Sequence, residues 1–309
     1  MLHYLMPTMA GYHESVIHAL LLAALVQQPA VRAARTIRVP RDLPTVQQAI
    51  DSASAGDTVL VAPGRYVENL RLRGENIVLA SEFILAHDFS LIERTILDGS
   101  RPSHPDSGSV ITIYKFEDST TVVEGFTITG GTGTVWYDNK DKILFREGGG
   151  ILVDLAGPTI RNNYITGNRA DSARDGVLSA GGGGVRVGFG DPILDHNMIT
   201  HNRGRYGGGV VLFYAAATLR ANLISQNEGG EDFGGAGLWA WGQLTRRLPN
   251  TLDSNVISRN VAHPADGRSH FRRTPQAGKG GGMSLRDAGA VLRNNLVSGN
   301  TPNDTEEIP

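Results

Sequence analysis

The sequence predicts an all-β protein: a right-handed parallel β-helix, a solenoid of coils of about 25 residues with a short capping helix near its N-terminus. Three observations lead to this prediction. Glycine runs recur along the chain, a pair of asparagines follows each run at a nearly constant distance, and apolar residues alternate within the same frame.

The glycine runs and the asparagines define the repeat. The runs are residues 148–150, 181–184, 207–209, 234–237 (interrupted by Ala236) and 280–282. Each is followed by the pattern Asn-x-Ile-x-x-Asn, with Val for Ile in the last, and the pairs are Asn163/Asn168, Asn197/Asn202, Asn222/Asn227, Asn255/Asn260 and Asn295/Asn300. From the last glycine to the first asparagine is 13 residues in four repeats (150 to 163, 184 to 197, 209 to 222, 282 to 295). In the fifth it is 18 (237 to 255), which indicates a small insertion at residues 245–249.

Apolar residues stand at fixed positions within this frame. The first and third residues after each run are Ile151/Val153, Val185/Val187, Val210/Leu212, Leu238/Ala240 and Met283/Leu285. Such alternation is typical of a strand with one buried face. A unit of this length cannot bury that face alone, so similar units must stack, with paired strands about 4.8 Å apart.

The glycines and asparagines have a mechanical interpretation. Both tolerate the left-handed backbone that sharp turns require, and asparagines repeated at one turn can hydrogen-bond along the stack. The glycine runs do not follow a strand and open a helix, so they do not fit a phosphate-binding loop. We therefore interpret both residue types as scaffold.

The segment before the first glycine run is predicted to start the solenoid. We expect a strand at residues 36–39, a helix at 43–53 with Pro44 in its first turn, and strands at 58–62, 69–72 and 77–80. A helix that closes the open end of a solenoid would prevent its strand edges from pairing with other chains.

The domain organisation follows from the two ends of the sequence. Residues 1–34 are predicted to be a signal peptide: residues 19–26 are apolar but too short to span a bilayer, and Val31 and Ala33 form a cleavage site near Ala33 or Ala34. The alternative is a disordered leader or a misassigned start, because residues 1–18 carry no Lys or Arg. Residues 35–300 are predicted to form the β-helix and 301–309 an acidic tail. We therefore expect a secreted, periplasmic or cell-surface protein without a transmembrane segment.

Composition excludes several classes of function. A net charge of −2 gives no reason to expect a nucleic acid as partner. The absence of cysteine excludes disulfides and thiolate metal sites.

Residues 45–72 (TVQQAIDSASAGDTVLVAPGRYVENLRL) resemble the opening of pectin lyase-like β-helix proteins, including pectinesterases. The glycine-run coils resemble the right-handed β-helix repeat of many bacterial secreted proteins, and together the resemblance covers about residues 36–300. It implies the fold more than the activity, because this superfamily includes lyases, hydrolases, esterases, epimerases and non-enzymatic surface proteins. The paired-Asp motif of pectinesterases, the Gly-His-Gly segment of polygalacturonases and the Asp-Pro-His signature of mannuronan epimerases are all missing.

The frame also predicts an outward-facing stripe along one sheet. The second and fourth residues after each run are Leu152/Asp154, Arg186/Gly188, Val211/Phe213, Trp239/Trp241 and Ser284/Arg286. We predict substrate-binding roles for Phe213, Trp239, Trp241, Arg186, Arg286 and Asp154, because sugar rings stack on aromatic faces. Two interpretations stay open: the aromatics line a groove, or a long loop covers them as a second small core. Asp154 and Arg186 are alternatively an ion pair between neighbouring coils.

Four insertions are predicted to emerge at one corner beside this stripe, at residues 132–147, 169–180, 228–233 and 261–279. They supply the candidate catalytic residues. Arg268 and His270 would serve a lyase, which needs a cation and a base. Glu231 and Asp232 would serve a glycoside hydrolase, which needs two carboxylates. We expect no cofactor or metal; calcium at the acidic insertion is a lesser alternative, because its spacing matches no calcium loop.

Two functional hypotheses follow. The first is a secreted β-helix that binds or cleaves a polysaccharide or surface glycan in a groove along one sheet, acting as a polysaccharide lyase or glycoside hydrolase if it is an enzyme. The second is a non-catalytic cell-surface or adhesion solenoid.

Overall fold

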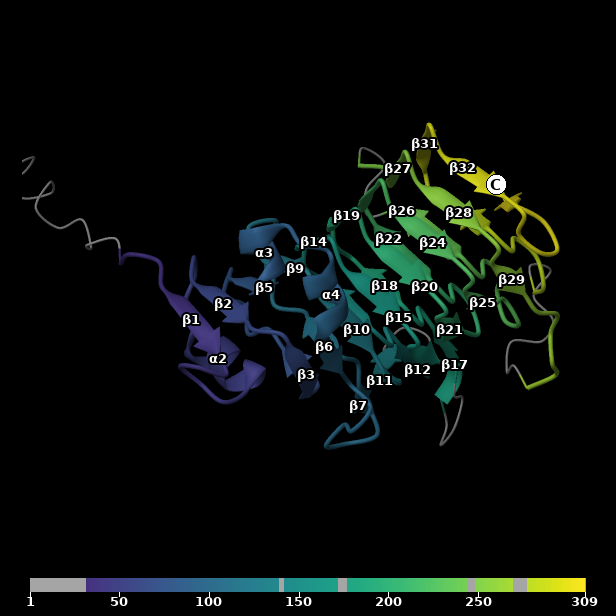
Figure 1. Ribbon diagram of the computed structural model, residues 1–309. Helices are drawn as coiled ribbons and strands as arrows, with labels where there is room; N and C mark the ends of the chain where they lie inside the picture. Colours follow the sequence, from purple (N-terminus) through teal and green to yellow (C-terminus); the bar gives the residue numbers. More distant parts are fainter. Residues whose placement is uncertain (1–31, 139–141, 172–176, 244–247, 269–276, 309) are drawn as a thin grey trace, which may run out of the picture. The chain divides into compact units, whose positions relative to one another are not determined.

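The computed structural model describes residues 32–138, 142–171, 177–243, 248–268 and 277–308. The chain divides into a unit that ends at Ala34 and a second unit from Arg35 to Pro309. Residues 32–34 of the first unit have no regular structure. The second unit is a stack of coils whose strands form three long parallel sheets and two short ones (Figure 1).

The three long sheets are A, B and C. Sheet A contains, in spatial order, β1 (Thr36–Val39), β2 (Thr58–Val61), β5 (Val78–Ser81), β9 (Val122–Glu124), β14 (Thr159–Arg161), β19 (Ile193–Asp195), β23 (Thr218–Arg220), β27 (Thr251–Asp253) and β31 (Val291–Arg293). Sheet B contains β3 (Gly64–Val67), β6 (Thr95–Asp98), β10 (Thr127–Thr129), β15 (Tyr164–Thr166), β20 (Met198–Thr200), β24 (Leu223–Ser225), β28 (Val256–Ser258) and β32 (Leu296–Ser298). Sheet C contains β4 (Leu70–Arg71), β8 (Ile111–Ile113), β13 (Ile151–Asp154), β18 (Val185–Gly188), β22 (Val210–Ala215), β26 (Leu238–Gln243), β30 (Met283–Arg286) and β33 (Thr305–Ile308).

The short sheets D and E lie on the path from sheet B back to sheet C. Sheet D contains β7 (Ser107–Gly108), β11 (Gly133–Asp138), β12 (Ile143–Glu147) and β17 (Val177–Gly181). Sheet E contains β16 (Arg169–Ala170), β21 (Arg203–Gly204), β25 (Glu228–Gly229) and β29 (Val261–Ala262). From β13 onward a coil therefore visits sheets C, A, B and E in turn, which confirms the predicted parallel β-helix.

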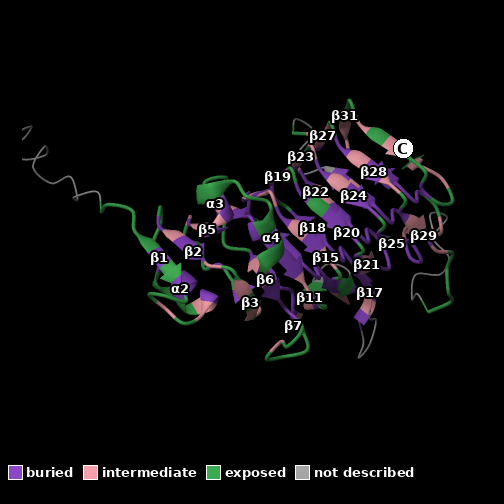
Figure 2. Ribbon diagram, in the orientation of Figure 1, coloured by how far each residue is buried: buried purple, intermediate pink, exposed green. Residues whose placement is uncertain are grey.

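The glycine frame aligns the strands of sheet C residue for residue. Ile151 is in register with Val185, Val185 with Val210, and Val210 with Leu238. Inward-facing residues are fully buried along each sheet, as in Ile160, Leu194, Leu219 and Leu252 of sheet A and Ile165, Ile199, Ile224 and Ile257 of sheet B. Figure 2 shows these buried strands running through the stack.

The asparagines form two hydrogen-bonded ladders, as the sequence predicts. Nδ2 of Asn197 donates to Oδ1 of Asn222 over 3.0 Å and to the Ile160 carbonyl over 2.8 Å. The left-handed residue of each turn, however, is the one before the asparagine, such as His196 (φ 54°) or Ala221 (φ 52°). Asparagine is therefore required at these positions for its side-chain hydrogen bonds and not for a left-handed backbone conformation.

Four of the five runs have one glycine with a positive φ, for example Gly207 (φ 51°), and the run 234–237 has two, Gly234 and Gly235. The last glycine of the run is required for a different reason. A Cβ on Gly209 would lie 2.5 Å from the carbonyl oxygen of Gly237 on the next coil. Neighbouring backbones approach too closely there for any side chain.

Helix α2 (Val46–Ser52) caps the N-terminal end of the stack. It begins after Thr45, whose Oγ1 accepts a hydrogen bond from the Gln48 amide over 3.2 Å. Its buried residues Val46, Ala49 and Ile50 join the main core, and it contacts β1 and β4, the end strands of sheets A and C. The capping helix is thus confirmed, although it starts after Pro44 and not at residue 43.

Two short helices, α3 (Phe83–Ala86) and α4 (Ser90–Arg94), follow β5 and were not predicted. Their buried residues Phe83, Leu91 and Ile92 form a small cluster, and α4 contacts β6 and β10 of sheet B. No helix in the described part of the chain has the length and apolar character needed to cross a membrane.

The acidic C-terminal segment is not a separate tail. Its residues Thr305–Ile308 form β33, which pairs in parallel with β30 and extends sheet C by one strand. The expected boundary at residue 300 therefore cuts through the last coil, because backbone pairing continues past it.

Candidate binding cleft on sheet C

A cleft of about 300 Å³ lies on the outer face of sheet C. Its floor comes from four strands and its wall from β11, with aromatic residues of the adjoining turns at the sides. The lining residues are Arg71, Thr112, Tyr114, Thr134, Trp136, Leu152, Asp154, Arg186 and Phe189. This mixture of aromatic surface and a few convergent polar groups is typical of small-ligand and glycan sites.

The wall belongs to the hairpin β11–β12, formed by the first predicted insertion. The strands pair antiparallel with Trp136 opposite Phe145, and the two rings stack with centres 5.2 Å apart. Side chains alternate along a strand. Trp136 therefore lines the cleft while its neighbour Tyr137 points away from it.

A buried carboxylate, Glu147, joins the wall to the floor. Trp136 Nε1 donates to its Oε2 over 2.7 Å, and Arg186 Nε lies 2.9 Å from the same oxygen. The hydroxyl of Tyr206 donates to its Oε1. Burial, the charge of Glu147 and this hydrogen bond raise the pKa of Tyr206 well above its ordinary value, so the phenol stays protonated.

Arg186 is the buried cation of the site, with 2% of its surface exposed. It forms an ion pair with Asp154 on the preceding coil, which confirms the alternative of an ion pair between neighbouring coils. Burial lowers the pKa of Arg186, but Glu147 and Asp154 outweigh it and raise that pKa above its ordinary value. The Asp154 side chain is 35% exposed, so it presents a fixed carboxylate to the cleft.

An aromatic strip continues from the cleft toward the C-terminal coils. We define it as Phe189, Phe213, Tyr214 and Trp241, with Arg286 at its end. The ring of Phe213 lies 5.6 Å from Phe189 and 5.7 Å from Trp241, and the Arg286 guanidinium lies 5.0 Å from the Trp241 ring centre. Phe213, Trp241 and Arg286 are aligned by strand register, so the strip crosses one coil per residue.

Trp239 does not belong to this open strip. It is 5% exposed and packs with Tyr206, Val211 and Phe233 in a second small core. The second interpretation, a small core under a loop, is confirmed for one row of the stripe, while a groove at Phe213, Trp241 and Arg286, which do not line the cleft, stays a prediction. The row two residues after the glycines is buried, and the row four residues after them contributes the partly exposed rings. The expected groove position of Trp239 is wrong because the loop carrying Phe233 covers it.

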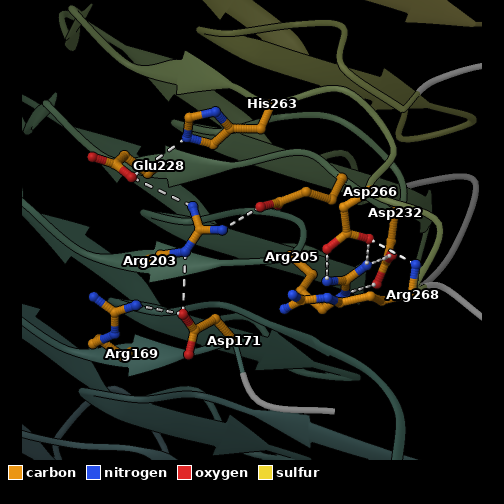
Figure 3. Close-up of polar contacts among 10 residues, drawn as sticks. Arg169, Asp171, Arg203, Arg205, Glu228, Asp232, His263, Asp266 and Arg268 are labelled. Atoms are coloured by element: carbon orange, nitrogen blue, oxygen red, sulfur yellow. Dashed lines mark hydrogen bonds and ion pairs between the residues drawn. The ribbon is translucent and has the colours of Figure 1, made fainter.

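Glu231 and Asp232 are held in ion pairs beside sheet E. Figure 3 shows Asp232 next to its partner Arg205. Glu231 pairs with Arg203, and Asp232 with Arg205 over 2.7 Å. Both carboxylates are buried, with 3% and 1% of their residue surface exposed. They are therefore placed as structural anions of the insertion and away from the cleft lining.

The last insertion is fastened to the same network. Asp266 lies 2.9 Å from Arg205, whose hydrogen bond is the main cause that lowers the pKa of Asp266 below its usual range. Arg268 is exposed and donates its backbone N–H to Asp266 over 2.9 Å. Neither Asp266 nor Arg268 lines the cleft. His270 lies outside the described residues.

The carboxylates of the acidic insertion face basic side chains. Glu228 Oε2 lies 3.4 Å from both Arg203 Nη1 and His263 Nε2, and Glu231 forms an ion pair with Arg203. Within the described ranges, no three His, Asp or Glu side chains converge closely enough to hold a metal ion.

The sequence did not single out Trp136, Glu147 or Tyr206. Trp136 lies in an insertion that was correctly expected beside the stripe, but nothing in its surroundings distinguishes an inward from an outward ring. Glu147 and Tyr206 each directly precede a glycine run. That shared position was the available signal, since it brings both side chains to the same corner of the stack, two coils apart with Gly181 between them.

The comparisons with known proteins agree with this architecture. The family model described as "Right handed beta helix region" matches residues 107–304. Among solved structures, the pectin methylesterase of Aspergillus niger is similar over 92% of this chain and 83% of its own, with 12% identity and a TM-score of 0.48. Carrot pectin methylesterase is similar over 91% and 90%, with 12% identity and a TM-score of 0.42.

The mannuronan C-5 epimerase A-module of Azotobacter vinelandii is similar over 85% of this chain and 92% of its own, with 14% identity and a TM-score of 0.27. No curated protein sequence matches the chain. At these identities the likeness concerns the fold alone.

Proposed function

The chain belongs to the family of right handed beta helix regions, and we propose that it binds an extended polysaccharide along sheet C. The observation that carries the proposal is the continuity between the cleft at Trp136 and the aromatic strip that ends at Arg286. Phe189 belongs to both, so a ligand seated in the cleft meets the strip without a break.

The chemistry of the surface suits sugar rings. The C–H groups of a pyranose carry small positive partial charges and pack against the negative face of an aromatic ring. Tyr114 and Phe189 offer such faces around the cleft, and Trp136, whose faces contact Phe145 and Arg186, adds apolar ring edge to its lining. Asp154 and the hydroxyls of Thr112 and Thr134 offer hydrogen-bonding partners for sugar hydroxyls.

The strip sets the direction of the ligand. Its residues lie on successive strands from β18 to β30, three coil steps apart, which corresponds to roughly 14 Å. A short ligand would occupy only the cleft. A chain of several sugars lying across the coils would also contact Trp241 and Arg286.

The cleft favours binding over cleavage. Among its described lining residues, Asp154 is the one carboxylate, and it is paired with Arg186. Glycosidases use two carboxylates on either side of the scissile bond. We therefore place the protein closer to a glycan-binding solenoid than to a hydrolase. This proposal combines the glycan binding of the first hypothesis with the non-catalytic role of the second.

The test is binding to defined polysaccharides. The full chain is titrated with polygalacturonate, alginate and xylan, and bound fractions are measured by affinity electrophoresis. Trp136→Ala and Trp241→Ala should each weaken binding at least tenfold, because the first removes apolar ring surface from the cleft lining and the second removes a ring of the strip. Tyr137→Ala is the matched control, since this exposed ring lies on the same strand as Trp136 but faces away from the cleft.

Thermal unfolding of each variant separates a lost contact from a lost fold. The binding proposal is contradicted if no polysaccharide is retained, or if the control weakens binding as much as Trp136→Ala. Reducing ends and ultraviolet absorbance are followed in the same mixtures. Product formation that requires Asp154 would contradict the assignment to binding alone.

We also propose that the mature protein is exported after removal of residues 1–34. The apolar run at residues 19–26, the small residues before Arg35 and the division of the chain between Ala34 and Arg35 support this proposal. N-terminal sequencing of the protein recovered outside the cytoplasm should begin near Ala34 or Arg35. Recovery with residues 1–34 intact would contradict it.

A further inference from the structure

Sheet B carries a second groove, of about 490 Å³, on its outer face. Strand register aligns one outward apolar residue per coil in a row, and the row is Tyr164, Met198, Leu223, Val256 and Leu296. A parallel row of hydroxyls is formed by Thr200, Ser225, Ser258 and Ser298. Met198 and Leu296 are 47% and 58% exposed. An aligned apolar row of this kind marks an interaction surface, because soluble proteins seldom expose one otherwise.

The groove has a one-sided charge. Its lining includes His201 and Arg259, and among the described lining residues there is no Asp, Glu or Lys. Tyrosine, methionine and arginine are enriched in protein interfaces and aspartate, glutamate and lysine are depleted, while the three serines of the lining run against this trend. The composition therefore favours a protein ligand that carries negative charge.

The same sheet face is already covered by a helix nearer the N-terminus. Helix α4 lies against β6 and β10 (Figure 1). Its residues Leu91 and Ile92 are buried. Hydroxyls of the sheet satisfy its last carbonyls: Thr95 Oγ1 donates to the Leu91 carbonyl over 2.7 Å, and Thr127 Oγ1 donates to the Ile92 carbonyl over 2.9 Å.

Tyr164 connects the covered part of the face to the open part. It packs against the α3–α4 cluster on one side and is the first residue of the groove on the other. Beyond it the face continues uncovered through β20, β24, β28 and β32, as the partly exposed strands in Figure 2 show. The open part offers apolar side chains and hydroxyls, the two features that hold α4.

We propose that the open outer face of sheet B docks an amphipathic, acidic helical segment of a partner protein. Its apolar side chains pack on Met198 and Leu223, as Leu91 and Ile92 pack on the covered strands. The hydroxyls of the serine row donate to the terminal carbonyls of the docked helix. The carboxylates of that helix face His201 and Arg259. This surface is distinct from the cleft on sheet C, so the proposal does not depend on glycan binding.

The chain itself supplies a probe of the required chemistry. Residues 82–94, which contain α3 and α4, carry three carboxylates and one arginine. A fluorescent peptide of this sequence is titrated with the full chain, and binding is followed by fluorescence anisotropy. The control peptide has serine in place of Phe83, Leu91 and Ile92, which removes the apolar face but keeps the charges.

We expect saturable binding of the first peptide and at least tenfold weaker binding of the control peptide. Met198→Glu and Leu223→Glu in the protein should each weaken binding at least tenfold, because they place a carboxylate in the apolar row. Leu155→Glu is the matched protein control: Leu155 is 44% exposed, close to the 47% of Met198, but follows β13 of sheet C. Thermal unfolding confirms that the variants are folded.

Four results would overturn the proposal. Equal binding of the two peptides would show that no apolar docking occurs, as would equal effects of Met198→Glu and Leu155→Glu. A protein dimer that Met198→Glu dissociates in sedimentation would assign the face to a second copy of the chain. Loss of polysaccharide binding in Met198→Glu would assign it to a glycan, whereas unchanged polysaccharide binding keeps the two surfaces separate.

Discussion

The guanidinium of Arg186 lies over the indole ring of Trp136, 5.1 Å from the ring centre, and faces the carboxylates of Glu147 and Asp154. One buried cation thus connects the hairpin that forms the wall of the cleft with two coils that form its floor. The shape of the cleft depends on this ion pair network and not only on the stacked strands.

Replacement of Arg186 by methionine should therefore destabilise the protein by about 3 kcal/mol, because it leaves Glu147 buried without its cation. Urea unfolding followed by circular dichroism measures this change in the free energy of unfolding. The control is Arg220→Met, which removes an exposed arginine paired with Asp195 and should cost no more than about 1 kcal/mol. Equal effects of the two substitutions would contradict the structural role of Arg186.

The asparagine ladders predict a gradient of stability along the stack. Asn222 is buried, donates to the Leu194 carbonyl and to Asn255, and accepts from Asn197, whereas Asn295 stands on the last coil and is only partly buried. Asn222→Ala should lower the free energy of unfolding by about 2 kcal/mol, because it leaves buried backbone groups unpaired. Asn295→Ala should cost clearly less. An equal cost at both positions would argue against the ladder as a source of stability.

The glycine at the end of each run predicts a steric effect. Gly209→Ala places a methyl group 2.5 Å from the carbonyl oxygen of Gly237, so the coils must move apart, at a cost of about 1–3 kcal/mol. At Gly64 the added methyl group meets only the side chain of Tyr66 at 3.4 Å. Gly64→Ala should change stability by less than about 1 kcal/mol. The comparison is made by thermal unfolding, and a stable Gly209→Ala protein would contradict the tight approach of the backbones.

The attachment of the last insertion predicts a dependence on pH. The hydrogen bond from Arg205 lowers the pKa of Asp266, so the charged pair stabilises the fold above the ordinary carboxylate range and is lost as the pH falls through the lowered pKa. At pH 7, Asp266→Asn should lower the free energy of unfolding by about 1 kcal/mol. The difference from the unsubstituted protein should narrow as the pH falls below about 4. A difference that stays constant with pH would show that the charge of Asp266 is not its source.

The repeat made the coil predictable. Once Gly209 and Asn222 fix the frame, the inward positions of Val210 and Leu212 follow, and the structure confirms them together with their register. The ion pair of Asp154 with Arg186 was predictable for the same reason, because register places the two residues on neighbouring coils.

The insertions were not predictable to the same degree. Trp136 and Phe233 lie outside the repeat, so no neighbouring coil indicates which way their rings point. Trp239 and Trp241 are two residues apart on one strand and face the same side, yet the first is buried because it packs with Tyr206, Val211 and Phe233. Helices α3 and α4 interrupt the frame between sheets A and B and leave no periodic signal.

The common register of the coils makes the molecule extensible. From Asn197 to Asn222 the chain advances 25 residues and returns to the same corner one step further along the stack. Duplication of this segment would add one rung to each asparagine ladder, two rings to the strip and one apolar side chain to the open face of sheet B. The length of each surface is therefore set by the number of coils, so ligand size and chain length can change together without a new fold.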